Sequence, residues 1–236
     1  PQGASYRGVE TMDPGNIAHL FYAVALQGWL EQGMAQPSAE IDRAMADMLM
    51  RGSHDAASFV VDVLTGTTSG PALPSGPDAT WASQRNIVNR YFDKLSWSEL
   101  RAVNVNQKTW CDRPYGREQD FLGVALENRN QLTTEATARL LHSIVGGVSV
   151  SSVRSQLLMD LLAQSFAIAP RPTYLPASAQ VWSQRSLTSD MGHSISYIEG
   201  EGITPYLLVV FTTAESAQTM DLVTFVSERI FQVQKL

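Results

Sequence analysis

The sequence predicts an α+β fold, in which a helical body precedes a short antiparallel sheet covered by a last helix. Apolar residues recur at helical spacing through most of the first two thirds of the chain. The pattern then changes to short β-prone runs at 180–187, 194–199 and 206–212, separated by turns that contain glycine. An amphipathic helix over 216–233 follows. Because such a sheet needs a cover for its exposed apolar face, we expect this helix to pack on it.

Length and composition predict a single domain. The chain has 236 residues, of which 44% are hydrophobic and 17% charged, and this is enough to bury a full core. We therefore expect one domain over 1–236. It should be mainly helical from about 16 to 165 and consist of the sheet and terminal helix from about 178 to 236.

The helical part opens with its most apolar segment. Residues 16–32 carry apolar side chains at helical spacing and are closed by Gly33, which predicts a long, mostly buried helix. Further helices are predicted from Ser38, from Ser53 and over 81–95, 133–144 and 151–164. Residues 104–123 are rich in Asn, Pro, Gly and Arg without a sustained period. They predict a long ordered loop, a place where functional residues often lie.

Charge and hydropathy exclude two classes of partner. The formal net charge is −6, and the 17 Lys and Arg residues are scattered, so we expect neither nucleic-acid binding nor a polybasic membrane patch. No apolar run approaches the roughly 18 residues of a membrane-spanning helix, so we expect a soluble or peripheral protein. The sequence does not indicate its cellular compartment. The chain begins at Pro1 without a targeting pattern, so we expect any such segment to have been removed or to lie outside this sequence.

The residues that could hold a metal or form a disulfide are few. Cys111 stands alone, so it cannot form an intrachain disulfide and is expected to be a buried or idle thiol. Histidines and aspartates could together suit zinc or iron, but none has a metal-binding motif spacing: His19, His54, His193, Asp55 and Asp190. We therefore expect no metal and no cofactor.

Several blocks along nearly the whole chain carry a family resemblance. They are SYRGVE (5–10), LFYAVA (20–25), VDVLTGTTSG (61–70), NVNQKTW (104–110), PYGRE (114–118), ENRN (127–130), LTT (132–134) and YLLVVFT (206–212). In these blocks the chain resembles the class A β-lactamase-like serine hydrolases of the type found in cyanobacteria. The resemblance implies a β-lactamase/transpeptidase-like fold whose N-terminal strands are missing or reduced here, so that a further segment or a partner would complete the sheet.

The first catalytic motif of that family is altered. It places a Ser and a Lys three residues apart at the start of a buried helix, where the amine can take the hydroxyl proton as the serine attacks a carbonyl. The resemblance matches these positions to Asn16 and His19. Because an amide nitrogen is no nucleophile, we expect no acyl-enzyme at this position.

The other motifs are altered to different degrees. The Ser-Asp-Asn motif matches Ser53-His54-Asp55, which keeps the serine. The Lys-Thr-Gly-like strand matches Gln184-Arg185-Ser186, in which the lysine and the glycine have been replaced. Glu118 and Asp120 are candidates, by region only, for the acidic residue that activates the deacylating water.

These replacements predict a catalytically inactive β-lactamase-like protein that serves as a protein-binding or structural subunit, with an unknown protein partner or larger assembly. The alternative is a non-standard hydrolase in which Ser53, with His19 as its base, acts on an amide or ester. Loss of two lysines should shift the potential of the old cleft toward negative. We also expect Arg185 and Ser186 to narrow this cleft, since both are larger than the residues they replace.

Overall fold

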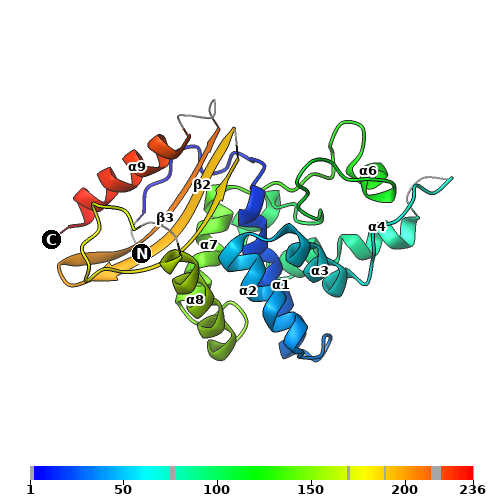
Figure 1. Ribbon diagram of the computed structural model, residues 1–236, viewed down its shortest axis with the longest axis horizontal. Coiled ribbons are helices and arrows are strands. Elements are labelled where there is room, and N and C mark those ends of the chain that lie inside the picture. The colour runs from blue at the N-terminus through cyan, green and yellow to red at the C-terminus, as the bar shows by residue number, and fades with distance from the viewer. Residues whose placement is uncertain (1–2, 75–77, 169–170, 189, 214–218, 236) are drawn as a thin grey trace.

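The computed structural model describes residues 3–74, 78–168, 171–188, 190–213 and 219–235. Its helical part contains η1 (Gly15–Ile17), α1 (Ala18–Glu31), α2 (Ala39–Arg51), α3 (His54–Thr65), α4 (Ala79–Arg85), α5 (Ile87–Asp93), η2 (Ser98–Ala102), α6 (Arg117–Leu122), α7 (Thr134–Val145) and α8 (Ser152–Ala167). The strands β1 (Gln180–Leu187), β2 (Met191–Gly200) and β3 (Ile203–Thr213) follow, and α9 (Thr219–Gln234) comes last. Figure 1 shows the sheet with α9 on one face and the helical body on the other. The predicted α+β arrangement is thereby confirmed.

The sheet is an antiparallel meander in the order β1-β2-β3. Its register pairs Val181 with Ile198 and Arg185 with Ser194. All three predicted strands are confirmed, but β2 is longer than expected, because Gly192 and His193 pair with both neighbouring strands. The last helix packs on β2 and β3, as its amphipathic pattern predicted. Residues 214–218, where this helix was expected to begin, lie outside the described residues.

Helix α1 is the centre of the core. Each residue from Ala18 to Leu30 is buried, so the helix has no solvent-facing stripe and is covered on all sides. It packs against α2, α3, α5 and α8 (Figure 1). The expectation of a long buried helix is confirmed, and η1 at its start is held at a fixed place in the molecule.

The predicted single helix over 81–95 is wrong, because the chain breaks at Asn86 between α4 and α5. The Asn86 amide donates to the Ala82 carbonyl oxygen (3.0 Å), and its oxygen accepts from Asn89 (3.1 Å) and Asn106 (2.8 Å). These side-chain bonds compensate for the local loss of helical hydrogen bonds. They also tie the helix pair to the start of the long loop.

The loop over 104–123 is anchored by buried charges and includes one short helix, α6, which its composition did not predict. Glu118, in the first turn of α6, is fully buried in an ion pair with Arg85 of α4. Lys108 pairs with Asp62 of α3 (2.8 Å) and donates to Ser69 (3.0 Å). An isolated buried charge is unfavourable, so each pair fixes the loop to the helical body.

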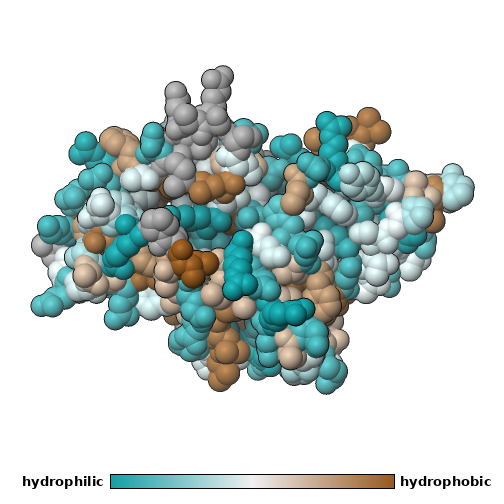
Figure 2. Space-filling view, in the orientation of Figure 1, coloured by the Kyte–Doolittle hydropathy of each residue, from teal (hydrophilic) through white to brown (hydrophobic). Residues whose placement is uncertain are grey.

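Side chains of mixed character cover the surface. Figure 2 shows a face on which hydrophilic residues predominate and apolar ones are scattered in small groups, as is usual for a protein in contact with water. Within the described ranges, no helix has both the length and the apolar character needed to cross a membrane.

Candidate functional site

The candidate site surrounds Asn16, which the resemblance matches to the family's nucleophilic serine. Asn16 lies in η1, directly before the buried helix α1. The turn leading into η1 is held by Asp13, whose carboxylate accepts from the backbone N–H of Gly15 (3.0 Å). The Asp13 carbonyl oxygen in turn accepts from His193 Nε2 of β2 (2.8 Å). The start of α1 is thus fixed against the sheet.

Asn16 is hydrogen-bonded to three residues that are distant in the sequence. Its backbone N–H donates to Ser186 Oγ (2.8 Å), and its carbonyl oxygen accepts from Gln184 Nε2 (2.8 Å). Its side-chain Oδ1 lies 3.1 Å from His54 Nε2. Ser186 and Gln184 are buried and belong to β1, so the edge strand is bonded to the residue at the nucleophile position. Of the two residues expected to narrow the cleft, Ser186 makes this contact, whereas Arg185 lies on the opposite face of β1 and makes no contact with Asn16 among the hydrogen bonds of the described residues.

His19, matched to the family's lysine, is fully buried one turn along the helix from Asn16. Its Nδ1 lies 3.1 Å from the Met48 carbonyl oxygen, and its Nε2 lies 3.1 Å from Thr109 Oγ1. Burial, reinforced by the charge of the nearby His54 and opposed by the Met48 hydrogen bond, lowers the pKa of His19 to about 3. His19 is therefore neutral at physiological pH, and both of its ring nitrogens are already engaged.

Ser53 has a structural role in the observed geometry. Its hydroxyl accepts from the backbone N–H of Ala56 (3.2 Å) and caps the first turn of α3. No hydrogen bond joins Ser53 to His19 in the described part of the chain. The preceding residue, Gly52, adjoins Asn16, since a Cβ placed on it would be 2.6 Å from the amide nitrogen of Asn16.

None of the carboxylates that the sequence placed near the site bonds to Asn16 or His19 in the described part of the chain. Asp55 and Asp190 are exposed, and Asp190 bonds to Thr188 (2.8 Å). Glu118 is committed to Arg85 and Ser69, and Asp120 is exposed. Among the residues that the structure describes, no three His, Cys, Asp or Glu side chains are grouped to hold a metal ion.

A second chain of contacts at Asn16 was missed by the sequence reasoning. Cys111, in the long loop, places its Sγ 3.4 Å from His54 Nδ1, while His54 Nε2 faces Asn16 Oδ1. The thiol is exposed. Three separate segments therefore bring together a thiol, an imidazole and an amide oxygen. No spacing in the sequence signals this arrangement, since it depends on where the loop folds.

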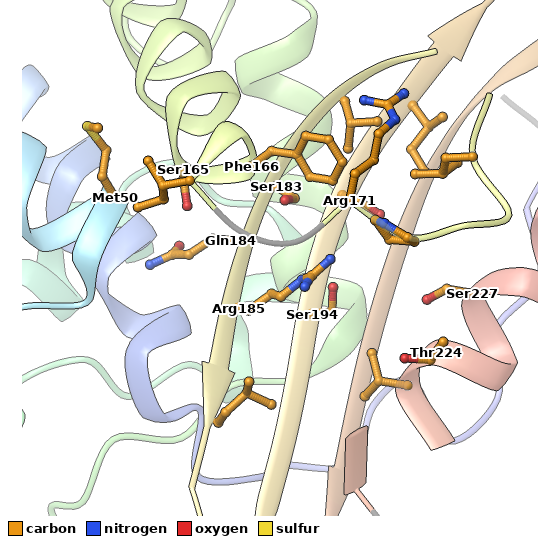
Figure 3. Close-up of a pocket in the computed structure, with 18 of the residues that line it drawn as sticks. Met50, Ser165, Phe166, Arg171, Ser183, Gln184, Arg185, Ser194, Thr224 and Ser227 are labelled. Atoms are coloured by element: carbon orange, nitrogen blue, oxygen red, sulfur yellow. The ribbon is translucent and has the colours of Figure 1, made fainter. Parts of the chain in front are cut away.

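A cavity of about 750 Å³ adjoins the site and extends around the edge strand β1 (Figure 3). On the site's side it is lined by Asn16, Gly52 and Gln184. Its lining includes three arginines and, among the described residues, no Asp or Glu. The expected shift of the cleft toward negative potential is therefore wrong for this lining, which does not include Asp55, Asp190 or Glu118.

Comparison with known proteins shows the fold. No protein-family model and no curated protein matches the chain. Among solved structures it is similar to a β-lactamase from Sphaerobacter thermophilus, with a TM-score of 0.66 and 10% identity over 97% of this chain and 86% of that one. It is also similar to a class A β-lactamase described as the last common ancestor of Gram-negative bacteria, with a TM-score of 0.65 and 16% identity over 97% and 87%. For a β-lactamase from Burkholderia vietnamiensis the TM-score is 0.63, with 13% identity over 95% of this chain and 82% of that one. The expected β-lactamase-like fold, with a reduced sheet, is thereby confirmed.

Proposed function

We propose that this chain, which has a β-lactamase-like fold, does not carry out serine acyl transfer and functions as a protein-binding or structural subunit. The observation that carries the proposal is the set of hydrogen bonds on Asn16. The residue at the nucleophile position has no hydroxyl, and its backbone N–H already donates to Ser186 Oγ at 2.8 Å.

That backbone N–H matters because acyl transfer requires donors that point at the developing oxyanion. A donor at the start of a buried helix is well suited to this role, since the helix dipole also favours negative charge there. Here Ser186 occupies the donor, and Gln184 bonds the carbonyl oxygen of the same residue. A substrate carbonyl would have to displace a buried hydroxyl that closes the site from within the chain. These hydrogen bonds support the proposal that the residues of this site now stabilise the fold and do not bind a substrate carbonyl.

The hydrolase alternative with Ser53 and His19 has less support. Ser53 donates no proton toward His19 and its oxygen serves as a helix cap, while the low pKa of His19 makes its imidazole a weak base. A nucleophile needs a base within hydrogen-bond reach of its proton.

A different candidate, a thiol hydrolase, is favoured by one specific observation, the Cys111–His54–Asn16 chain. With the proton on Nε2, His54 would donate to Asn16 Oδ1 and accept the thiol proton at Nδ1. The thiolate would attack an ester or amide carbonyl, and the leaving group would take the proton from His54 before water cleaves the thioester. This candidate ranks second because the thiol is exposed, and no oxyanion donor beside it is identified among the described residues.

These three candidate functions are distinguished by exposing the purified chain to nitrocefin and benzylpenicillin and then measuring its intact mass by mass spectrometry. The proposal expects no turnover above buffer and no covalent adduct. An adduct that maps to Ser53 would instead establish the alternative, and one that maps to Cys111 would establish the thiol candidate. Iodoacetamide labelling of Cys111, compared between His54→Gln and the exposed-histidine control His142→Gln, checks the thiol directly.

Restoring the four family residues tests whether the rest of the scaffold is still organised for catalysis. We expect the variant Asn16→Ser/His19→Lys/Gln184→Lys/Ser186→Gly to recover weak nitrocefin hydrolysis at best, because groups misplaced by an ångström or so cost roughly a hundredfold in rate. Recovery to the rate of an ordinary class A enzyme would show that the scaffold is still organised for catalysis. The binding role itself is tested by co-purification from the native source, with identification of the bound proteins. Recovery of the chain alone, as a monomer, would contradict a subunit role.

A further inference from the structure

The cavity continues beyond Asn16 around β1 to the outer face of the sheet, which carries none of the site residues described above. Neighbouring residues on a strand point to opposite faces, so Arg185 lies on the side opposite to Gln184 and Ser186. Helix α9 contributes Val223, Thr224 and Ser227 to the wall of this outer part. Figure 3 shows Arg185 extending across the sheet toward Ser194, with the α9 residues facing it.

The floor of the outer cavity changes from apolar to cationic along the two strands. The first cross-strand pair is apolar and consists of Val181 and Ile198. The next pair facing the same side carries two hydroxyls, Ser183 opposite Ser196, and the third pairs Arg185 with Ser194. From Val181 to Arg185 the strand advances four residues, or about 13 Å at about 3.3 Å per residue.

The apolar end is closed by side chains from outside the sheet. Phe166 of α8 and Leu175 are buried in the same cluster as Val181 and Ile198. Both line the cavity. An apolar group at this end would therefore pack against Val181, Leu175 and Phe166, over whose ring the Arg171 guanidinium lies 5.5 Å from the centroid.

The polar end has a cation that no carboxylate among the described residues neutralises. Arg51 is in an ion pair at the surface, and Arg171 donates to the carbonyl oxygens of Pro176 (2.6 Å) and Ala179 (2.8 Å). Arg185, by contrast, makes no hydrogen bond or ion pair with any residue that the structure describes. It lines a cavity whose described lining residues include no Asp or Glu, in a chain whose net charge is −6.

The hydroxyls around Arg185 are also available. Within the described ranges, the side chains of Ser183, Ser194 and Ser196 take part in no hydrogen bond, although Ser183 and Ser196 are buried. Burial raises the pKa of Tyr174, so this phenol stays neutral and does not compensate the guanidinium. The carboxylate of Glu228, which also acts on Tyr174, is exposed on α9 and does not line the cavity.

We propose that this outer cavity binds a small amphipathic carboxylate. Its head group would accept hydrogen bonds from Arg185, Ser183 and Ser194, and its apolar tail would lie against Val181 and Phe166. A guanidinium beside hydroxyl donors suits a carboxylate in geometry and charge. A pocket with an apolar wall and a few convergent polar groups is typical of small-molecule sites. The proposal is independent of the function proposed above, because it uses the opposite face of β1.

The test is calorimetric titration of the full chain with decanoate, which has a carboxylate on an apolar tail of suitable length, and with decan-1-ol as its uncharged counterpart. We expect saturable 1:1 binding of decanoate and binding of the alcohol at least tenfold weaker. Arg185→Gln should weaken decanoate binding by about tenfold to a hundredfold, the range for loss of a charge-assisted hydrogen bond. The same variant should leave the affinity for decan-1-ol unchanged.

Arg229→Gln is the matched control, because it makes the same charge change at an exposed position of α9 outside the cavity lining. We expect this variant to bind decanoate like the unaltered chain. Three results would each overturn the proposal: no saturable decanoate binding below about 1 mM, equal loss in both variants, or equal affinity for acid and alcohol. Circular dichroism of both variants shows that any difference in binding occurs in folded protein. Since serine acylation plays no part in these measurements, their failure would leave the function proposed above untouched.

Discussion

Acidification should destabilise this fold through His19. In the folded chain the pKa of His19 is lowered to about 3, because the ring is fully buried, whereas in an unfolded chain a histidine titrates near 6.5. Between these two values the unfolded chain binds a proton that the folded chain excludes. The contribution of His19 to stability is therefore fully present above the pKa of the unfolded histidine. It is lost progressively as the pH falls toward the pKa of the folded one.

The size of the effect follows from the window. A pH of 5 is about 1.5 units below the pKa of the unfolded histidine. At 1.36 kcal/mol per unit, the free energy of unfolding is therefore lower by about 2 kcal/mol at pH 5 than at pH 7.5. We expect urea unfolding to show this decrease in the free energy of unfolding between pH 7.5 and 5. His19→Gln should remove most of this slope, whatever its effect on absolute stability.

The control is His142→Gln, since His142 is exposed on α7 and takes no part in the contacts of His19. This variant should keep the pH dependence of the unaltered chain. If His19→Gln unfolds with the same pH dependence as the unaltered chain, His19 is not held neutral by burial and the reasoning fails.

Three further predictions concern stability and can be measured by urea unfolding at pH 7.5. Glu118→Ala should cost about 3–5 kcal/mol by leaving the Arg85 charge buried and unpaired, whereas replacing both partners with apolar residues should cost much less; equal losses would contradict this account. Ser53→Ala should cost about 1 kcal/mol through loss of the cap of α3, and a neutral result would remove the capping role. Gly52→Ala should destabilise more than Gly66→Ala: both glycines have positive φ (65° and 64°), but only at Gly52 would the new Cβ meet another group, Asn16, at 2.6 Å. Equal losses at the two glycines would mean that Asn16 moves away freely.

The sequence determined the parts of this protein that depend on local pattern. Helical periodicity identified α1 as a buried helix, and capping serines placed the starts of α2 and α3 at Ser38 and Ser53. The change to β-prone runs located β1 to the residue. Each of these depends on neighbours within a few positions, where spacing alone fixes which side chains share a face. That Asn16 has no hydroxyl is also visible without a structure.

Only the tertiary structure decided how distant segments meet. The break at Asn86 depends on hydrogen bonds with Asn106, 20 positions later, which no helical pattern contains. The pairing of Glu118 with Arg85 spans 33 positions and removed the candidate acid from the site. Cys111, which the sequence marked as idle, meets His54 because the long loop returns to α3. Such contacts depend on how whole elements pack, and an isolated residue type carries no information about its partner across the fold.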